Sequence, residues 1–170
     1  MTAEQRPGTG SRIPIKLFSL YLRAYFLRHF AALRLSRACP LPDIGANTVL
    51  YANHPSWWDP VVMLLFAAGP LARFRLFAPI EAAALARYPI LRRLGLFGVS
   101  IGRIEGTRRF IAESNEILRD ARNLLVMTAQ GRFADVRSRP AGLRNGVAHL
   151  LHAQPGRIAV PVALEYVFWN

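Results

Sequence analysis

The strongest constraint on the fold is an alternation of short apolar runs with helical stretches between residues 48 and 164. The predicted strands are Thr48–Ala52, Phe74–Ala78, Phe97–Ile101, Asn123–Thr128 and Arg157–Leu164. The predicted helices are Pro60–Ala68, Glu81–Leu94, Thr107–Ala121 and Ala141–His152. Strands that alternate with helices of this length are typical of α/β domains. We therefore expect a mixed, largely parallel sheet flanked by helices.

A basic helix is expected before this domain, within residues 13–40. Over Ile13 to Arg37, helical periodicity gathers several basic residues on an arc of about 60°, beside a broad aromatic and aliphatic face; they are Lys16, Arg23, Arg34 and Arg37. This pattern is typical of an amphipathic helix lying in a membrane surface, and it also fits a helix packed on its own domain.

The remaining parts of the chain are assigned by composition. Residues 1–12 are polar and rich in Gly, Pro and Ser, so we expect a disordered N-terminus. The α/β domain is assigned to residues 46–170. Either its last strand closes the sheet, or the chain is a C-terminally truncated part of a longer product.

The charge balance indicates an anionic partner. Lys and Arg total 22 against 10 Asp and Glu, a formal net charge of +12, and only Lys16 is a lysine. Arginine favours phosphates and carboxylates, so membrane headgroups, a phosphorylated cofactor, an acidic carrier protein and nucleic acid are all candidates. A hydrophobic content of 52% and the lack of a recognisable nucleic-acid motif argue against nucleic acid.

Composition also limits the other classes. Cys39 is the only cysteine, which excludes an internal disulfide and a metal site built on several cysteines. We expect no metal and no bound cofactor. No apolar run reaches the roughly 20 residues that span a membrane. A cytoplasmic location is the default expectation.

The most informative segment is Asn53-His54-Pro55-Ser56-Trp57-Trp58-Asp59-Pro60. A predicted strand precedes it, and Asp59-Pro60 is a helix-start signal. His54 is therefore expected at the carboxyl end of a strand, where open α/β sheets bind ligands. A turn between them would let Asp59 fold back onto the imidazole of His54 and improve it as a base. Alternatively, Asp59 only caps the helix near an incidental His54. Ser56 is expected to be a turn residue rather than a nucleophile.

The segment as a whole resembles the Asn-His-x-x-x-x-Asp signature of the glycerolipid and lysophospholipid acyltransferase family, which includes 1-acylglycerol-3-phosphate acyltransferases. Three later blocks fit this resemblance in order. Gly98-Val99-Ser100-Ile101-Gly102-Arg103 is similar to the second block, in which the resemblance implies that Arg103 contacts the acceptor's phosphate. Ile158-Ala159-Val160-Pro161-Val162 is similar to the fourth, an apolar strand with a central proline.

The third block departs from the family pattern. Thr128-Ala129-Gln130-Gly131-Arg132-Phe133 stands where the family usually reads Pro-Glu-Gly-Thr-Arg. Gly131 matches, Gln130 replaces the glutamate, and Phe133 replaces the arginine, with Arg132 one position earlier. The resemblance implies that Gln130, Gly131 and Arg132 bind substrate. Because of this departure, the sequence favours a phosphate-bearing acceptor less strongly.

The resemblance implies an O-acyltransferase of lipid metabolism and phospholipid biosynthesis. His54 would act as general base and Asp59 would orient it. A fatty acyl group would pass directly from acyl-CoA or an acyl carrier protein to a lysophospholipid, glycerol phosphate or related lipid alcohol. Donor phosphates would meet arginines such as Arg92, Arg93, Arg108 and Arg109. Peripheral binding to the cytoplasmic face of the membrane is expected. The alternative function is a non-catalytic membrane or lipid-carrier binding protein on the same fold.

Overall fold

The computed structural model describes residues 12–36 and 44–167. Within them, five strands form one parallel sheet in the order β3-β2-β4-β1-β5. The strands are β1 (Thr48–Ala52), β2 (Arg75–Glu81), β3 (Leu96–Val99), β4 (Asn123–Thr128) and β5 (Ile158–Val162). The predicted α/β class is confirmed. The sheet of the described residues is wholly parallel rather than mixed.

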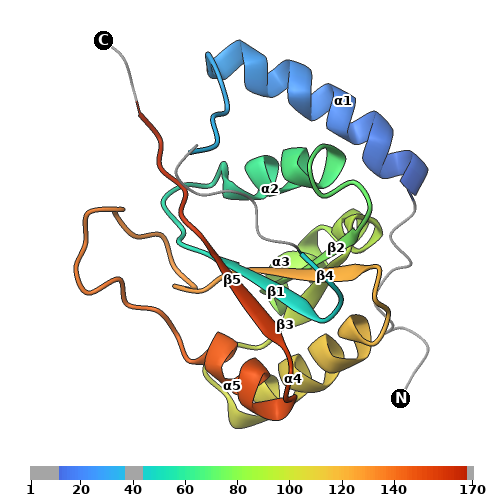
Figure 1. Ribbon diagram of the computed structural model, residues 1–170, viewed down its shortest axis with the longest axis vertical. Helices are drawn as coiled ribbons and strands as arrows, with labels where there is room; N and C mark the ends of the chain where they lie inside the picture. Colours follow the sequence, from blue (N-terminus) through green and yellow to red (C-terminus); the bar gives the residue numbers. More distant parts are fainter. Residues whose placement is uncertain (1–11, 37–43, 168–170) are drawn as a thin grey trace.

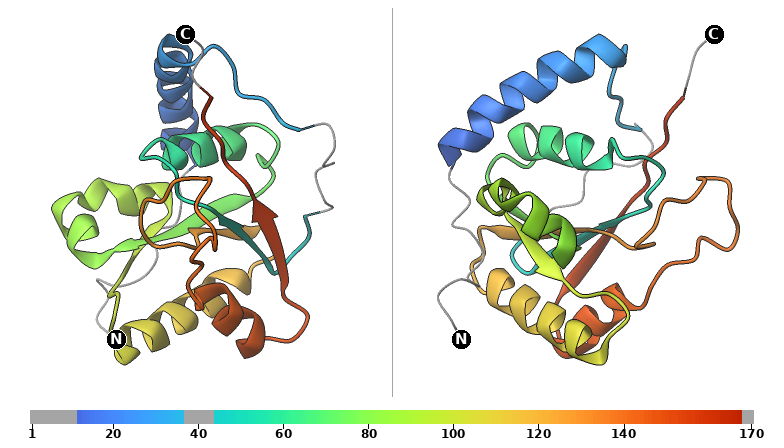
Figure 2. Two further views of the ribbon diagram at one scale, coloured as in Figure 1. Left: turned by 90° about the vertical axis from the view of Figure 1, so that its left-hand side faces the viewer. Right: turned by 180° about the vertical axis from the view of Figure 1, so that it is seen from behind.

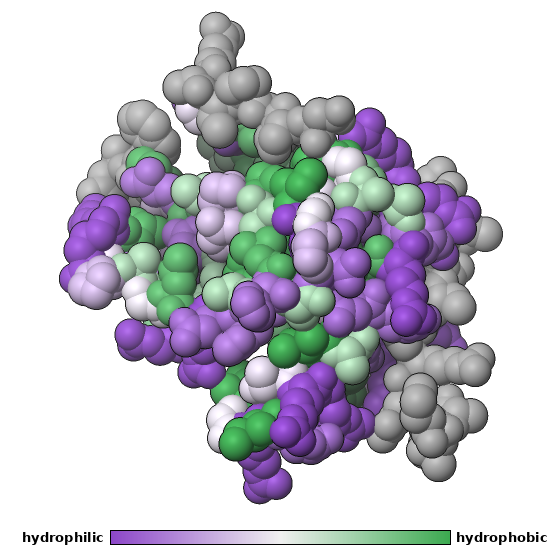
Figure 3. All heavy atoms as spheres, turned by 60° about the horizontal axis from the view of Figure 1, so that its bottom comes forward, coloured by the Kyte–Doolittle hydropathy of each residue, from purple (hydrophilic) through white to green (hydrophobic). Residues whose placement is uncertain are grey.

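Helices cover both faces of this sheet. Figures 1 and 2 show α1 (Arg12–His29) outermost over α2 (Asp59–Ala68) on one face, and α4 (Ile104–Leu118) with α5 (Gly146–Ala153) on the other. Figure 3 brings the α4–α5 side forward, and hydrophilic residues there separate the hydrophobic ones into patches. Among the described residues, no helix is long and apolar enough to cross a membrane.

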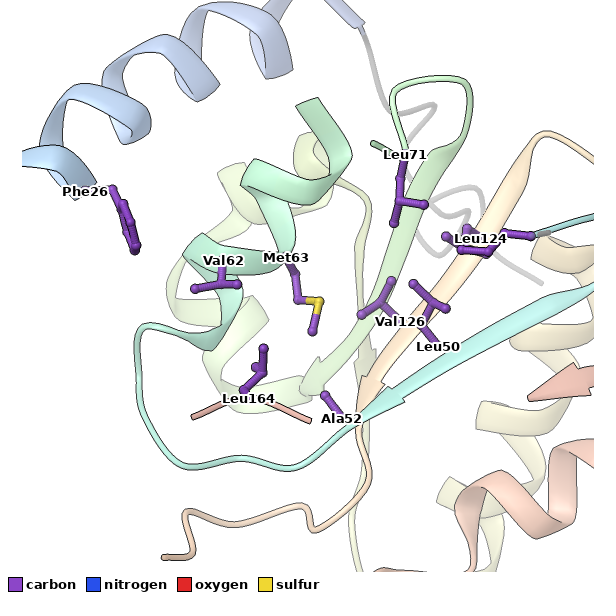
Figure 4. Packing of buried hydrophobic residues seen from close by; sticks show 10 residues of the cluster. Phe26, Leu50, Ala52, Val62, Met63, Leu71, Leu124, Val126 and Leu164 are labelled. Atoms are coloured by element: carbon purple, nitrogen blue, oxygen red, sulfur yellow. The ribbon is translucent and has the colours of Figure 1, made fainter. Parts of the chain in front are cut away.

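The larger core lies between the sheet and α2. Figure 4 shows Leu50 of β1 and Val126 of β4 pointing toward Val62 and Met63 of α2, with Phe26 of α1 at the margin. The strands β1 and β4 are buried on both faces. This explains why both appear in the sequence as continuous apolar runs.

The bounds of several predicted elements needed correction. β2 continues to Glu81 instead of ending at Ala78, and α4 covers Ile104–Leu118 instead of Thr107–Ala121. The first helix ends at His29 instead of Arg37; residues 30–36 are not helical, and Arg37 lies outside the described residues. The predicted helix Glu81–Leu94 is broken into α3 (Ala82–Arg87) and the 3₁₀ helix η2 (Pro89–Leu94), because Pro89 disfavours helical backbone at the residue before it. The last helix begins at Gly146 instead of Ala141. The predicted disordered N-terminus, apart from Arg12, also lies outside the described residues.

The connections reverse direction between β1 and β4. The chain leaves β1 through α2 on one face of the sheet, and it leaves the adjacent β4 through α5 on the opposite face. Such a topological switch point is where open α/β sheets bind ligands, outside the carboxyl ends of the strands. His54 follows β1 and Gln130 follows β4, so both lie at this point.

Candidate functional site

The turn from β1 to α2 carries the His54 segment. β1 ends at Ala52, and α2 begins at Asp59, with Pro60 in its first turn. The Asp59 N–H donates to the Ser56 carbonyl at 3.2 Å, and the Trp58 N–H donates to the Ser56 hydroxyl at 3.2 Å. Ser56 is thus a turn residue, as predicted. The tight turn brings the start of α2 back beside His54.

His54 and Asp59 form a hydrogen bond. The distance from His54 Nδ1 to Asp59 Oδ2 is 2.6 Å. A carboxylate only accepts hydrogen bonds, so the imidazole donates from Nδ1 and carries its acceptor lone pair on Nε2. The His54 side chain keeps 18% of its surface exposed. This is the geometry of a general base held in one tautomer.

The Asp59 carboxylate is fully buried, at 0% exposure. Its Oδ2 also accepts from the Ser56 N–H at 3.3 Å, and its Oδ1 accepts from the Tyr166 hydroxyl at 2.7 Å. No side-chain capping bond is formed at the start of α2. The alternative reading of Asp59 as a simple helix cap is therefore wrong. A buried charge is costly unless it is paired, and here the pairing holds it next to His54.

Gln130 supports His54 from β4. Its Oε1 accepts from the His54 N–H at 2.7 Å, and its Nε2 donates to the Ala141 carbonyl at 2.7 Å. The side chain is buried, at 4% exposure. The sequence predicted a contact with substrate, but both polar ends of this amide bind the protein itself. A glutamate could not donate to Ala141, which accounts for an amide at this position.

Phe133 lies against the imidazole. Its ring centroid is 4.4 Å from that of His54, and the ring remains 59% exposed. The Ala134 N–H donates to the His54 carbonyl at 3.0 Å and fixes the loop that carries Phe133. The exposed ring of Phe133 therefore places an apolar surface beside His54.

The α1 helix packs directly on the His54 segment through aromatic rings. Trp58 stacks on Tyr25 of α1 with centroids 5.5 Å apart, and it meets Phe30, the residue after α1, edge-on at 4.9 Å. Trp57 stacks on Trp58 at 4.5 Å while remaining exposed. α1 thus covers α2 and also packs against Trp58, the residue that precedes Asp59.

Arg103 lies elsewhere along the same edge of the sheet. It is exposed, directly before α4, and it follows β3. Two strands, β2 and β4, separate β3 from β1. Three inter-strand steps correspond to about 14 Å. An acceptor of lipid size could reach both His54 and Arg103, but the two side chains are not neighbours.

Gly131 and Arg132 lie in the loop after β4. Gly131 has φ +60°, and an added Cβ would lie 2.8 Å from Nε of Arg144. Arg132 is exposed, and its Nη2 lies 3.8 Å from the Cβ position of Gly142. Arg144, which sequence reasoning missed, therefore brings a second guanidinium to this loop.

Two of the arginines expected to meet donor phosphates have an acidic neighbour. Burial raises the pKa of Glu113, and the charges of Arg109 and Arg92 oppose that rise. The charges of Arg109 and Arg92 therefore partly stabilise the Glu113 carboxylate of α4. Arg93 and Arg108 are exposed. Within the described part of the chain, no group of three His, Cys, Asp or Glu side chains could hold a metal ion.

Tyr166 is a second site residue, besides Arg144, that the sequence analysis did not identify. Burial raises its pKa, and the hydrogen bond to Asp59 and the charge of that carboxylate raise it further. Its hydroxyl therefore stays protonated and acts as a donor. One signal was present in the sequence: Tyr166 closely follows a predicted strand, and strand ends in a parallel sheet share one edge.

Comparisons of the chain with models of known protein families, with curated proteins and with solved structures found no match.

Proposed function

We propose that this protein is an O-acyltransferase that moves a fatty acyl group from a thioester to the hydroxyl of a lipid acceptor. The observation that carries the proposal is the bond of 2.6 Å between His54 and the fully buried Asp59. It lies at the switch point of the sheet, and the sequence around it resembles the acyltransferase signature. A lone histidine with an incidental carboxylate would not require this much burial and pairing.

In this mechanism, His54 Nε2 accepts the proton of the acceptor hydroxyl as its oxygen attacks the thioester carbonyl. Asp59 stabilises the imidazolium that forms. The tetrahedral intermediate collapses by breaking the C–S bond, and the thiolate takes the proton from Nε2. The products are the acylated acceptor and the free thiol. This direct transfer needs no covalent acyl-enzyme, because the acceptor oxygen itself attacks the thioester.

The start of α2 is a poor source of oxyanion donors. The N–H groups of Trp58, Asp59 and Val61 donate to protein oxygens within the turn or helix, and Pro60 has no N–H. The cationic loop of Arg132 and Arg144 beside Gly131 is the better candidate, because a guanidinium stabilises a developing negative charge directly.

We further propose that α1 binds the cytoplasmic face of the membrane in-plane and that the protein is peripheral. At about 100° per residue, Leu20, Ala24 and Leu27 project within an arc of about 60°, on the face opposite the packed side. Leu20 is 64% exposed and Leu27 is 58% exposed. The exposed Arg23 and Arg28 lie about 40° beyond this ridge on either side, where they would meet anionic headgroups.

Transfer from a fatty acyl thioester to a panel of lyso-lipids, glycerol phosphate and neutral lipid alcohols tests the catalytic proposal. We expect acylated product with the wild-type protein and its loss in His54→Ala, by at least about 10³-fold. The matched control is His149→Ala, because His149 is exposed on α5. Unchanged transfer by His54→Ala would refute the mechanism. Absence of transfer by the wild-type protein across the panel would favour the non-catalytic lipid-binding alternative.

Flotation with anionic phosphatidylglycerol vesicles tests the membrane proposal. Leu20→Ser combined with Leu27→Ser removes the apolar ridge without touching the packed face, so we expect loss of vesicle binding with an unchanged melting temperature. Ala83→Ser, an exposed position on α3, is the control. Retained binding by the double variant would refute this role of α1.

A further inference from the structure

The two oxygens of the Asp59 carboxylate have different partners. Oδ2 accepts from His54 and from the Ser56 N–H, whereas Oδ1 accepts from the Tyr166 hydroxyl at 2.7 Å. The carboxylate is fully buried, so bulk water cannot replace a lost donor. The Tyr166 bond therefore decides how the carboxylate is rotated about its own axis.

Tyr166 is held firmly enough to direct this bond. The Asn53 side chain clamps the chain two residues earlier, because its Oδ1 accepts from the Leu164 N–H at 2.7 Å and its Nδ2 donates to the Leu164 carbonyl at 2.8 Å. The Tyr166 ring also contacts Phe30, with centroids 5.9 Å apart. The residue directly before His54 thus anchors the segment that reaches Asp59.

We infer that Tyr166 is a positioning residue for the His54–Asp59 pair, an inference that rests on the proposed acyl transfer. The hydroxyl fixes Oδ1 so that Oδ2 faces His54 Nδ1. It also donates to the carboxylate on the oxygen that does not face His54. Tyr166 touches neither substrate nor donor in this role and acts only through Asp59.

The opposing explanation is that Tyr166 only packs against Phe30. Tyr166→Phe separates the two, because it keeps the ring and removes the hydroxyl. The matched control is Tyr25→Phe, since Tyr25 belongs to the same aromatic cluster and its ring stacks on Trp58. A positioning role predicts an effect on proton transfer, whereas a packing role predicts an effect on stability alone.

The first measurement is the pH–rate profile of acyl transfer. For Tyr166→Phe we expect kcat to fall about 10-fold, the effect of losing one hydrogen bond to a charged group, with KM unchanged. The acid limb should move to higher pH, because a carboxylate with one donor fewer holds the imidazolium more strongly. Tyr25→Phe should leave the profile in place. A fall in activity with an unmoved acid limb would overturn the inference.

The second measurement does not depend on catalysis. The proton resonance of His54 Nδ1–H, recorded by NMR on the protein without substrate, should be displaced in Tyr166→Phe and not in Tyr25→Phe. If the resonance moves although the wild-type protein transfers no acyl group, the positioning role stands and the proposed function fails. If it does not move, the positioning role fails whatever the activity.

Discussion

The turns that follow β1 and β3 both carry motif residues, yet they are built in opposite ways. In the β1 turn, His54 and Asp59 are fixed by bonds to Ser56, Gln130 and Tyr166. In the β3 turn, Arg103 is exposed, and the rigidity lies in the backbone beneath it, where Gly106 packs on Ser100. The proposed acyl transfer needs fixed atoms in the first turn, whereas the proposed role of the second turn is only to present a charge.

The largest effect should come from Asp59→Asn in the first turn. The amide group has one acceptor where the carboxylate has two, so either His54 or Tyr166 faces a donor. We expect kcat to fall about 10³–10⁴-fold, as for an orienting carboxylate in other His-based sites. Steady-state kinetics and circular dichroism of the folded variant check this. Activity within about 10-fold of wild type would show that the buried pair does not drive catalysis.

Gly106→Ala should be the strongest perturbation of the second turn. An added Cβ would lie 1.9 Å from the Ser100 carbonyl oxygen, so the backbone must move. We expect the free energy of unfolding to fall by about 2–3 kcal/mol, although alanine normally favours a helix. Gly45→Ala is the control, since nothing lies within 4 Å of its added Cβ. Equal denaturation midpoints for the two variants would contradict the close packing.

Gln130→Glu tests whether the turn after β1 depends on the side chain that follows β4. The new carboxylate would face the Ala141 carbonyl, an acceptor, while still accepting from the His54 N–H. We expect a loss of about 1–3 kcal/mol in stability, the cost of an unsatisfied buried polar group, and a lower kcat. Chemical denaturation and transfer assays measure both. Unchanged stability and an unchanged kcat would indicate that the side chain at position 130 reorients freely. Gln130 would then again be a candidate for substrate contact.

Arg103→Ala should affect recognition and leave the fold intact. Because Arg103 is exposed, the melting temperature should hardly change. For phosphate-bearing acceptors we expect KM to rise about 10-fold through loss of a charge-assisted contact. Neutral lipid alcohols should be unaffected, and Arg119→Ala, an exposed arginine just after the C-terminal end of α4, serves as control. Identical KM changes for charged and neutral acceptors would rule out a phosphate contact.

The smallest effect is a pH dependence confined to the first turn. The pKa of Tyr166 is raised in the folded protein above its ordinary value of 10.0. The folded state therefore holds this proton more tightly, so its stabilising contribution is complete below pH 10 and declines as pH rises further. Urea denaturation above pH 10 should show a shallower decline in Tyr166→Phe than in the wild-type protein. Parallel curves would mean that Tyr166 ionises alike in both states.

The strands and the turn that carry His54 could be predicted from local sequence, whereas the contacts that fix His54 and Asp59 could not. Thr48–Ala52 and Asn123–Thr128 were predicted at their observed bounds, because buried parallel strands read as apolar runs. The turn between His54 and Asp59 followed from Pro55 and Asp59-Pro60. Tyr166 and the inward role of Gln130 could not be derived, since they depend on strand order. That order reflects tertiary packing, which single-sequence periodicity does not encode.

The clamp of Asn53 on Leu164 joins residues 111 positions apart, and the Tyr166–Asp59 bond joins residues 107 apart. Contacts of such sequence separation carry a high entropic cost and slow folding, because a long loop must close to form them. During synthesis, the partners of Asn53 and Asp59 are made only after nearly all of the remaining described chain. A polypeptide interrupted before β5 would carry the full motif and still lack Leu164 and Tyr166, the partners of Asn53 and Asp59.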